Sequence, residues 1–526
     1  MMNTIQPSSR FIDGHAKTKY AREEKEVHRA LTDDAFAGEG SVEKRGLVLM
    51  QIDGLSHRAL RKAMEKGDAP NIRKLLDTKG YALSPFQCGI ATVTLPVLSS
   101  FFYGIELPGN DWYDKASGQF VDGSVYETEL RKELEAKGEK GILSEGVVYS
   151  SPLSGGSKET GLTVNSLKES QKKHGTLRTL FHEAIQDIKM LKKGGYSLTK
   201  TAWSFIRDIA KASIWMRKEG VANTRLDILA PVMMSLNHNI FEKVAAAGFT
   251  EAINKGVPVM FTDFAAYDEK AHYFGADSKE AMDMLKSIDT QIGKVVDSAE
   301  KSPLKYEVLV FSDHGQTPSK LFQDVYGSKV GDMISNFAKL TKESRGESYN
   351  NGEIVFTDAY SLGNIYFNFD KGPADLNEVN QHYPQLIDFI ANHPGIGLVC
   401  GRQDENLIIR GKDGSLSVNS DNQVMQSGKN PLTPYGDEGV ILTQISNYMK
   451  VKGSGDVVIF GAYDREKDEV IDFNKKYSLR SLHGGLGGDQ IKPFIISKPE
   501  VPINGGQIHE ATQLHELHKK YKEYLR

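Results

Sequence analysis

Hydrophobic residues follow two alternating patterns from residue 46 onward. Short apolar runs that predict strands occupy residues 47–52, 259–262, 308–311, 456–460 and 494–496, and the run at 308–311 is typical of a strand buried on both faces of a parallel sheet. Stretches with the spacing of one apolar helix face lie between several of these runs, and one of them covers residues 284–296. This alternation predicts an α/β fold with a mixed, mostly parallel central sheet that is flanked by helices.

Turn-forming residues place the expected helices more closely. Two helices should follow the first strand, at residues 56–66 and 70–80, because Pro70 suits a first helical turn and Gly80 a C-terminal stop. A shorter helix is expected at residues 385–392. The last helix, at about residues 508–525, carries three histidines that we assign to exposed positions outside any site: His509, His515 and His518.

The pattern divides the chain into four parts. Residues 1–45 are polar and charged, with a helical stretch around residues 21–27, and form an N-terminal extension. The remaining parts are the first portion of the α/β core at 46–165, a basic helical insertion at 166–250, and the second portion of the core at 251–526, which contains a smaller subdomain around 335–450.

The insertion differs from the rest of the chain in its charge. Residues 167–220 hold 12 Lys and Arg against five acids, and their apolar spacing predicts two or three amphipathic helices. The basic face is either a solvated surface, the commoner case, or a surface that attracts anionic lipid or a phosphorylated substrate. Peripheral membrane contact through residues 166–220 is therefore left open.

The overall composition is that of a soluble globular protein, with 39% hydrophobic and 25% charged residues among 526. A formal net charge of −4 argues against wholesale nucleic-acid binding. The two cysteines, Cys88 and Cys400, are too few for a disulfide framework, which favours a reducing compartment. Residues 1–45 contain no apolar segment like a secretory signal, and no run approaches the roughly 18 apolar residues of a membrane span. We expect a cytoplasmic protein.

Candidate chemistry lies at the ends of the predicted strands. Asp53 follows the apolar run at 47–52, and Asp313 and His314 follow the run at 308–311 within a Ser-Asp-His-Gly turn. Ligands bind at the carboxyl ends of strands in open α/β sheets, so these adjacent side chains could be metal ligands. The same tetrapeptide is also a good loop on composition alone.

Three further segments supply candidate partners, each with a plain structural alternative. Thr94 can cap a helix whose first turn contains Pro96, which would place its hydroxyl at the positive end of the helix dipole; a simple N-cap is the alternative. Asp268 and His272 are four residues apart and would share one helix face, where they could bind one ion or form a surface hydrogen bond. His483 stands in a glycine-rich loop, a weak signal by itself.

All of these side chains lie at a predicted strand end or helix start, so they can converge on one edge of the sheet. The set comprises three carboxylates, three imidazoles and one hydroxyl: Asp53, Thr94, Asp268, His272, Asp313, His314 and His483. Such a set can hold two divalent cations about 4 Å apart, the arrangement used for in-line displacement at phosphorus. Nitrogen and oxygen ligands without thiolate favour Zn²⁺ first and Mn²⁺ second.

Five segments in order carry a family resemblance. They are QIDGL at 51–55, TLP at 94–96, YDEKAH at 267–272, SDHG at 312–315 and HGGLGG at 483–488. Together they resemble the type I phosphodiesterase and nucleotide pyrophosphatase family of the alkaline phosphatase superfamily, over most of residues 46–500. The resemblance implies an alkaline-phosphatase-like fold and a metal-dependent hydrolase of phosphoesters.

The resemblance also implies a role for each candidate residue. It divides six of them between two metal ions: Asp268, His272 and His483 at one, and Asp53, Asp313 and His314 at the other. Thr94 is also bound at the second ion, where it is the nucleophile and forms a phospho-threonine intermediate. Asn110 is the candidate for the asparagine that holds a phosphate oxygen in family pyrophosphatases, at a shorter spacing from the nucleophile.

The neighbouring sequence argues against a catalytic role for two other residues. Thr92 lacks the Thr-x-Pro spacing of Thr94 and is the less favoured nucleophile. Cys88 lacks the Cys-x-Pro-x-Arg context of the related sulfatases, which argues against sulfate ester hydrolysis.

Three functional hypotheses follow. The first is a two-metal phosphodiesterase that acts on a small molecule such as a nucleotide or a lipid head-group diester. The second is a phosphomonoesterase or phosphoryl transferase on the same core. The third is a non-catalytic protein in which the bound ions have a structural role. It would dock on a membrane or a partner through its basic helices.

Overall fold

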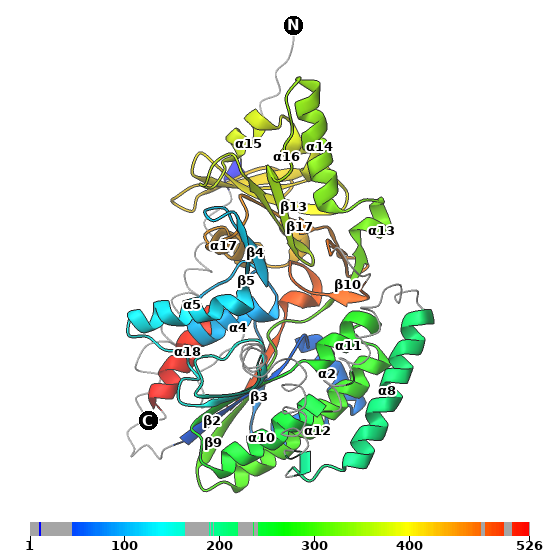
Figure 1. Ribbon diagram of the computed structural model, residues 1–526, viewed down its shortest axis with the longest axis vertical. Coiled ribbons are helices and arrows are strands. Elements are labelled where there is room, and N and C mark those ends of the chain that lie inside the picture. The colour runs from blue at the N-terminus through cyan, green and yellow to red at the C-terminus, as the bar shows by residue number, and fades with distance from the viewer. Residues whose placement is uncertain are drawn as a thin grey trace.

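The computed structural model describes residues 10–11, 45–163, 189, 191–192, 194–218, 235, 240–474, 479–498 and 508–524. The expected helical stretch around 21–27 and most of the N-terminal extension lie outside these residues, as does much of the expected insertion at 166–250. The described chain forms two units that follow one another along the long axis of the molecule, each built around a large sheet (Figure 1).

Seven strands form the central sheet of the unit drawn lower in Figure 1. In spatial order they are β3 (Ala82–Pro85), β21 (Phe494–Ser497), β9 (Lys305–Phe311), β2 (Arg45–Ile52), β8 (Val259–Phe264), β6 (Val147–Ser151) and β7 (Glu159–Thr163). The five strands from β9 to β7 are parallel, whereas β21 pairs antiparallel with β9 and β3 with β21. The sheet is mixed and mostly parallel, as the sequence predicted.

Helices cover both faces of this sheet (Figure 1). One face carries α2 (His57–Lys66), α3 (Pro70–Lys79), α10 (Glu242–Asn254), α11 (Ala266–Phe274) and α12 (Lys279–Lys301), and the other α4 (Thr94–Tyr103), α5 (Gly123–Ala136) and α18 (Ala511–Tyr524). In α12 the apolar positions Leu285, Ile288 and Ile292 are fully buried against the sheet. The hydroxyl of Ser278 caps this helix by accepting the N–H of Ala281.

An eight-stranded sheet forms the core of the second unit. Its order is β1 (Arg10–Phe11), β16 (Val424–Gly428), β15 (Gly414–Val418), β14 (Asn406–Gly411), β13 (Ile396–Gln403), β17 (Val457–Gly461), β12 (Leu362–Phe367) and β11 (Ile354–Ala359). Every pairing in it is antiparallel. One face packs on α14 (Val330–Ser344), α15 (Leu376–His382) and α16 (Leu386–Ala391), and the other on η4 (Thr433–Tyr435) and α17 (Glu438–Tyr448).

Shorter elements lie between the two large sheets. A four-stranded sheet contains β18 (Tyr463–Asp464), β19 (Glu469–Asp472), β10 (Thr317–Leu321) and β20 (Ser481–Leu482). The other elements are the hairpin of β4 (Asp111–Asp114) and β5 (Gln119–Asp122), the helix α13 (Phe322–Tyr326) and the turn η5 (Gly488–Ile491). β10 follows β9 of the central sheet, and the loop after β20 leads back to β21. The small sheet therefore connects the two units.

Within the expected insertion the structure describes one long helix, α8 (Leu198–Lys218), and the beginning of α10. The part of the predicted amphipathic helices that precedes residue 189 lies outside the described residues. Among the helices that the structure describes, none has the length and apolar character needed to cross a membrane.

Candidate metal centre

The carboxyl ends of three neighbouring strands meet at one edge of the central sheet. Asp53 directly follows β2, and Asp313 and His314 lie just beyond β9, a neighbour of β2. On the other side of β2, β8 leads into α11, which carries Asp268 and His272. Because parallel strands end at the same edge of a sheet, this topology brings together five of the predicted residues from distant segments.

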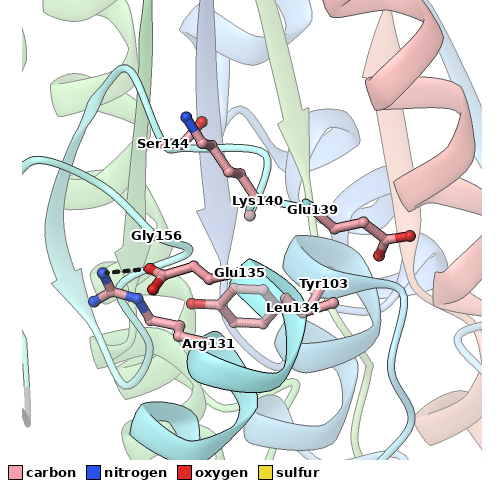
Figure 2. Close-up of a pocket in the computed structure, with 9 residues that line it drawn as sticks. Tyr103, Arg131, Leu134, Glu135, Glu139, Lys140, Ser144 and Gly156 are labelled. Carbon is pink, nitrogen blue, oxygen red and sulfur yellow. Dashed lines mark ion pairs between the residues drawn. The ribbon is translucent and has the colours of Figure 1, made fainter. Parts of the chain in front are cut away.

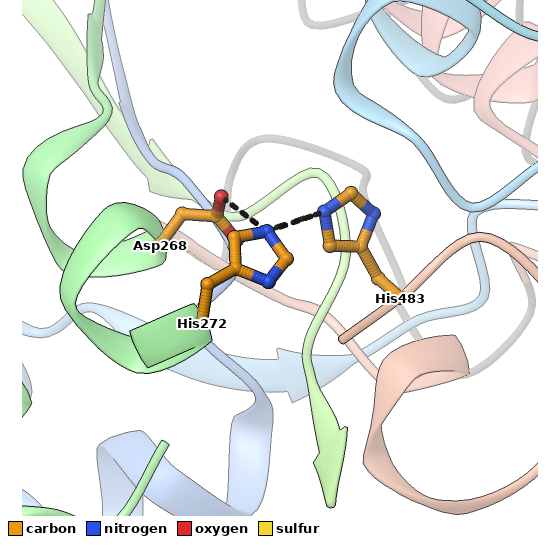
Figure 3. A group of neighbouring side chains, drawn as sticks. All are labelled: Asp268, His272 and His483. Carbon is orange, nitrogen blue, oxygen red and sulfur yellow. Dashed lines mark hydrogen bonds and ion pairs between the residues drawn. The ribbon is translucent and has the colours of Figure 1, made fainter. Parts of the chain in front are cut away.

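Asp268, His272 and His483 form the first group, which we call the Asp268 cluster. His272 Nε2 lies 3.1 Å from Asp268 Oδ2, one turn away on α11. From the loop after β20, His483 brings its Nε2 to 3.2 Å from His272 Nε2 and 3.8 Å from Asp268 Oδ1. Figure 3 shows the His483 ring approaching the helix from the opposite loop. The ligand atoms of the three side chains lie within 4.8 Å of one another, close enough to share one ion.

Thr94, Asp53, Asp313 and His314 form the second group, the Thr94 cluster. Thr94 Oγ1 donates to Asp53 Oδ1 at 3.3 Å and lies 3.3 Å from His314 Nε2. His314 Nε2 is in turn 3.5 Å from Asp53 Oδ1 and 3.2 Å from Asp313 Oδ2. That buried Oδ2 atom has no hydrogen-bond partner within the described chain. A cation would supply the missing partner.

The two clusters adjoin each other. The rings of His314 and His483 stack with their centroids 3.7 Å apart. In addition, a carboxylate oxygen of Asp268 lies within 4.8 Å of ligand atoms of Asp53 and His314. All seven residues predicted as metal ligands are thus brought to one place.

All three imidazoles are oriented through their Nδ1 atoms. The partners are backbone carbonyl oxygens: Ser481 for His272 at 2.9 Å, Gly315 for His314 at 3.0 Å, and Thr92 for His483 at 2.7 Å. A carbonyl oxygen only accepts, so each Nδ1 is the donor and each Nε2 is left for a metal ion. This is the arrangement by which metal-binding histidines are held in proteins.

Asp53 and Asp313 are buried carboxylates whose negative charge is not fully compensated by protein groups. Burial raises the pKa of Asp53 well above its ordinary value, and the charges of Asp313 and Asp268 add to that effect. Burial also raises the pKa of Asp313. For Asp268, burial raises the pKa, but the adjacent His272 outweighs it and holds the pKa below its ordinary range. Divalent cations would compensate this negative charge, so the donor set, the Asp313 oxygen without a hydrogen bond and the charge balance all fit metal ions.

Thr94 is the first residue of α4 and not its cap. The N-cap position is Val93, and it makes no side-chain capping hydrogen bond, so the predicted capping role of Thr94 is wrong. The hydroxyl of Thr94 instead contacts Asp53 and His314. It remains at the positive end of the helix dipole, where a negative charge on its oxygen is stabilised.

Thr92 joins the loop of His483 to the segment before α4. Its Oγ1 accepts the N–H of Gly484 at 2.8 Å and donates to the carbonyl of Gly485 at 3.2 Å. Its own carbonyl accepts the Nδ1 proton of His483. Because the Thr92 hydroxyl is buried and already has two partners, it is not available as a nucleophile, in agreement with the preference for Thr94.

Gln316 positions the Asp268 cluster and was given no role by the sequence. Its Nε2 donates to the side chain of Asp268 and, at 3.0 Å, to its backbone carbonyl. Its Oε1 accepts the hydroxyl of Ser481, the residue whose carbonyl orients His272. The residue follows the Ser-Asp-His-Gly segment directly, but its partners lie 48 and 165 positions away, so only the fold reveals the function of the amide.

Tyr360 comes from the second unit and lies beside the imidazoles. Its ring centroid is 4.9 Å from that of His483 and 5.4 Å from that of His272. It occupies the tight turn between β11 and β12, with a positive φ of 57°. Within the described chain its hydroxyl makes no hydrogen bond. The eight-stranded unit therefore contributes one wall of the centre, which no local sequence pattern indicated.

A further carboxyl, Asp263, lies near the end of β8. Burial raises its pKa well above the ordinary value, and the charges of Asp313 and Asp268 act in the same direction. In the β2–β8 register it stands opposite Gln51. Sequence reasoning missed it because it lies inside the strand and not in the turn that follows.

Two other predicted residues lie away from the clusters. Asn110 is exposed just before β4, its carbonyl accepts the N–H of Gly123 at 2.8 Å, and no contact in the described chain links it to either cluster. Its role as a phosphate ligand stays a prediction. His515 of α18 is buried and not exposed as predicted, because its Nδ1 hydrogen-bonds the carbonyl of Phe101 at 3.0 Å.

Two cavities of the described chain are separate from the clusters. One of about 220 Å³ lies at the C-terminal end of α4, where Tyr103 and the Arg131–Glu135 ion pair contribute to its wall (Figure 2). The other, of about 300 Å³, lies between α3, α12 and β9 and includes Lys79 and Lys498. None of the seven predicted ligands lines either cavity. The candidate site is therefore identified by the metal-binding side chains of the two clusters and not by the size of a cavity.

A sequence model of the family described as type I phosphodiesterase / nucleotide pyrophosphatase matches residues 47–336, more than half of the chain. The chain belongs to this family. Membership makes it an enzyme of the phosphodiesterase and nucleotide pyrophosphatase class, in which phosphoesters are hydrolysed with metal ions. The matched residues include six of the seven candidate ligands, all except His483.

Solved structures resemble the chain over most of its length. Phosphonoacetate hydrolase from Sinorhizobium meliloti 1021, in complex with phosphonoformate, matches with a TM-score of 0.50 and 13% identity, covering 91% of this chain and 96% of its own. Murine ectonucleotide pyrophosphatase / phosphodiesterase 5, as an inactive variant in complex with AMP, matches with a TM-score of 0.45 and 12% identity. The match covers 92% of this chain and 95% of the murine chain. No curated protein matches the sequence at a significant level. At these identities the hydrolase supports the fold alone, and it confirms the predicted alkaline-phosphatase-like α/β architecture.

Proposed function

We propose that this family member is a two-metal-ion phosphodiesterase that acts through a phospho-threonine intermediate at Thr94. The observation that carries the proposal is the position of Thr94 Oγ1, 3.3 Å from both Asp53 Oδ1 and His314 Nε2 at the start of α4. A hydroxyl that touches both a carboxylate and a ligand-type imidazole nitrogen is placed for activation as a nucleophile.

Two ions would be held by the two clusters. Asp268, His272 and His483 would bind one, and Asp53, Asp313 and His314 the other, where the Thr94 oxygen also lies. When bound, the ions would lower the pKa of the Thr94 hydroxyl and neutralise charge on the phosphate oxygens. Nitrogen and oxygen donors without thiolate suit Zn²⁺ first and Mn²⁺ second.

The residues of the chain account for the order of events. The Thr94 hydroxyl loses to solvent the proton that it now directs at Asp53 Oδ1, and its oxygen attacks phosphorus in line. The new bond joins Thr94 Oγ1 to phosphorus, while the bond from phosphorus to the leaving oxygen breaks on the opposite side. Water then cleaves the phospho-threonine and restores the hydroxyl. The positive end of α4 favours the alkoxide and the phosphoryl group at both steps.

The proposed substrate is a small phosphodiester, such as a nucleotide or a lipid head-group diester. A diester site must accommodate a second substituent on phosphorus, which a monoesterase site need not do. Aryl diesters and aryl monoesters with the same leaving group, assayed with added Zn²⁺ or Mn²⁺, therefore separate the two activities. Faster hydrolysis of the monoester would replace the phosphodiesterase assignment with a phosphomonoesterase.

The nucleophile is tested by Thr94→Ala, with the exposed Thr78→Ala as its control. We expect the first variant to lose about a thousandfold or more in kcat and the control to keep wild-type activity. Acid quenching of the wild-type reaction followed by peptide mass spectrometry should place a phosphoryl group on Thr94. A Thr94→Ala protein with undiminished metal-dependent hydrolysis would refute the assignment.

A further inference from the structure

The helix α8 presents an exposed apolar stripe. Trp203, Ile206 and Ile214 are 70%, 61% and 68% exposed. Their spacing of three and eight residues places them on one side of the helix. Figure 1 shows α8 along an outer edge of the molecule, beyond α11 and α12. Large apolar side chains gathered on one exposed face usually mark a surface that contacts something else.

Cations flank this stripe on the same exposed side. Lys200, Arg207 and Lys211 are exposed and alternate with the apolar residues along the helix. Residues 198–218 contain five basic residues and one acid, in a chain whose formal net charge is −4. The positive charge of α8 is therefore a local feature of this helix.

The single acid of α8 lies on the inner side of the helix. The side chain of Asp208 is only 12% exposed, and its charge acts on Lys243 of α10 and Lys270 of α11. The inner side is also fixed by Ser235, whose hydroxyl donates to the carbonyl of Phe205 at 2.9 Å. The helix therefore has an inward side that holds Asp208 and an outward side of apolar groups and cations, and Arg207 pairs with Asp208 between the two sides, its Nε 3.1 Å from Oδ1.

We propose that the outward face of α8 docks the protein on an anionic membrane surface. A helix with Trp and Ile on one side, and with Lys and Arg beside them, lies in the interface between lipid head groups and acyl chains. Tryptophan is favoured at that depth, and each cation near an anionic leaflet adds to the attraction. The apolar stripe and the flanking cations lie together along residues 200–214, and both match an anionic lipid surface.

Docking through α8 would bring the membrane to the side of the molecule on which α11 lies (Figure 1). Asp208 of α8 acts on Lys270, which lies on α11 between the two ligand candidates Asp268 and His272. The proposal stands independently of the catalytic assignment, because it concerns binding to the membrane and not turnover.

The test is co-sedimentation of the full-length protein with vesicles. We expect binding to phosphatidylcholine vesicles that contain about one third phosphatidylglycerol, weaker binding to pure phosphatidylcholine, and release at high salt. Replacing Lys200, Arg207 and Lys211 together by serine should weaken binding to the anionic vesicles about a hundredfold. In a Trp215→Phe background, which removes the other tryptophan of α8, Trp203→Ser should abolish the blue shift of tryptophan emission on binding, since the remaining Trp112 is buried in the protein.

A matched control uses another exposed helix. Leu340 of α14 is 65% exposed and stands beside the exposed Lys339, so Lys339→Ser with Leu340→Ser removes similar groups elsewhere. The control should bind as wild type does, and thermal unfolding should show that all variants are folded. Absence of wild-type binding to anionic vesicles, or equal loss in the α14 control, would overturn the proposal. So would a dimer that forms without lipid and dissociates in Trp203→Ser, because that would assign the stripe to a second copy of the chain.

Discussion

His483 donates its Nδ1 proton to the backbone carbonyl of Thr92 over 2.7 Å. The bond links a histidine from the C-terminal part of the chain to the segment that positions Thr94, two residues further on. The orientation of a candidate ligand and the placement of the candidate nucleophile therefore depend on the same short contact. The hydroxyl of Thr92 reinforces it through Gly484 and Gly485.

Thr92→Val should destabilise the protein and weaken its metal binding. The substitution keeps the shape of the side chain but leaves the N–H of Gly484 and the carbonyl of Gly485 without their buried partner. We expect the free energy of unfolding to fall by about 2–3 kcal/mol and the affinity for one ion to fall about tenfold. Urea unfolding and calorimetric metal titration measure the two effects. Thr78→Val, at an exposed helical position, should change neither.

Gln316→Ala should lower metal affinity through Asp268. Without the amide, the carboxylate of Asp268 and the hydroxyl of Ser481 both lose a hydrogen bond. Partners of this kind typically contribute 10- to 100-fold in metal affinity or activity, and we expect a loss of about that size. The measurement is kcat as a function of added metal ion, with the exposed Gln323→Ala as control. If excess metal fails to restore any activity while the variant remains folded, Gln316 acts on something other than ion binding.

Tyr360→Ala and Tyr360→Phe should separate the ring from the hydroxyl. The ring lies beside His483 and His272, whereas the hydroxyl has no hydrogen bond within the described chain. We expect Phe to retain nearly wild-type kcat/KM and Ala to lower it about tenfold, because the imidazoles lose a packing neighbour. Steady-state kinetics with a soluble aryl diester provides the comparison. A large loss in the Phe variant would show instead that the hydroxyl contacts the substrate.

Glu106 should make stability depend on pH. Burial raises the pKa of its carboxyl from 4.5 to about 7, and the nearby charge of Glu510 contributes to the shift. Between those two values the unfolded chain loses the proton while the folded protein retains it, so stability falls as the pH rises from 4.5 to about 7. Glu106→Gln should reduce the difference in unfolding free energy between pH 5 and pH 8 by about 1 kcal/mol, allowing for partial solvent screening.

Urea unfolding of the wild type and Glu106→Gln at the two pH values tests this expectation. Glu65→Gln, an exposed glutamate on α2, is the matched control and should leave the difference unchanged. If the Glu106 variant keeps the full wild-type dependence, another buried carboxyl is responsible.

The central sheet could be predicted from the sequence because its strands are buried on both faces. Leu49 and Val48 of β2 pack into different cores on the two sides of the sheet, so the strand appears as one continuous apolar run. The eight-stranded sheet is harder to predict from the sequence. Strands such as β14 and β16 are only partly buried and lie between Gly- and Asn-rich turns, so they show no continuous apolar run. The pairing of Arg10–Phe11 with β16 has no local signal at all, because two residues acquire strand geometry only from their partner.

The predicted ligands were recognisable because each is a metal-binding residue type at a strand end or helix turn. Three residues near the clusters could not be recognised in this way: Gln316, Tyr360 and Asp263. A side-chain amide, a tyrosine in a turn and a carboxylate inside a strand are common in sequences and do not by themselves indicate a metal site. Asn110 was chosen because the family resemblance implies an asparagine after the nucleophile helix, although its spacing is shorter here, and no contact in the described chain links it to the clusters. The cytoplasmic location likewise stays a prediction; Cys88 and Cys400 are both buried and unpaired.

The candidate centre takes Asp53 from the first strand of the central sheet and His483 from the loop after the small sheet. During translation the emerging polypeptide cannot assemble both clusters until residue 483 has left the ribosome, even though the residues of β2, β8 and β9 are available much earlier. A nascent chain that lacks residue 483 therefore cannot form the complete Asp268 cluster, so the proposed hydrolytic activity should appear only after that residue has emerged.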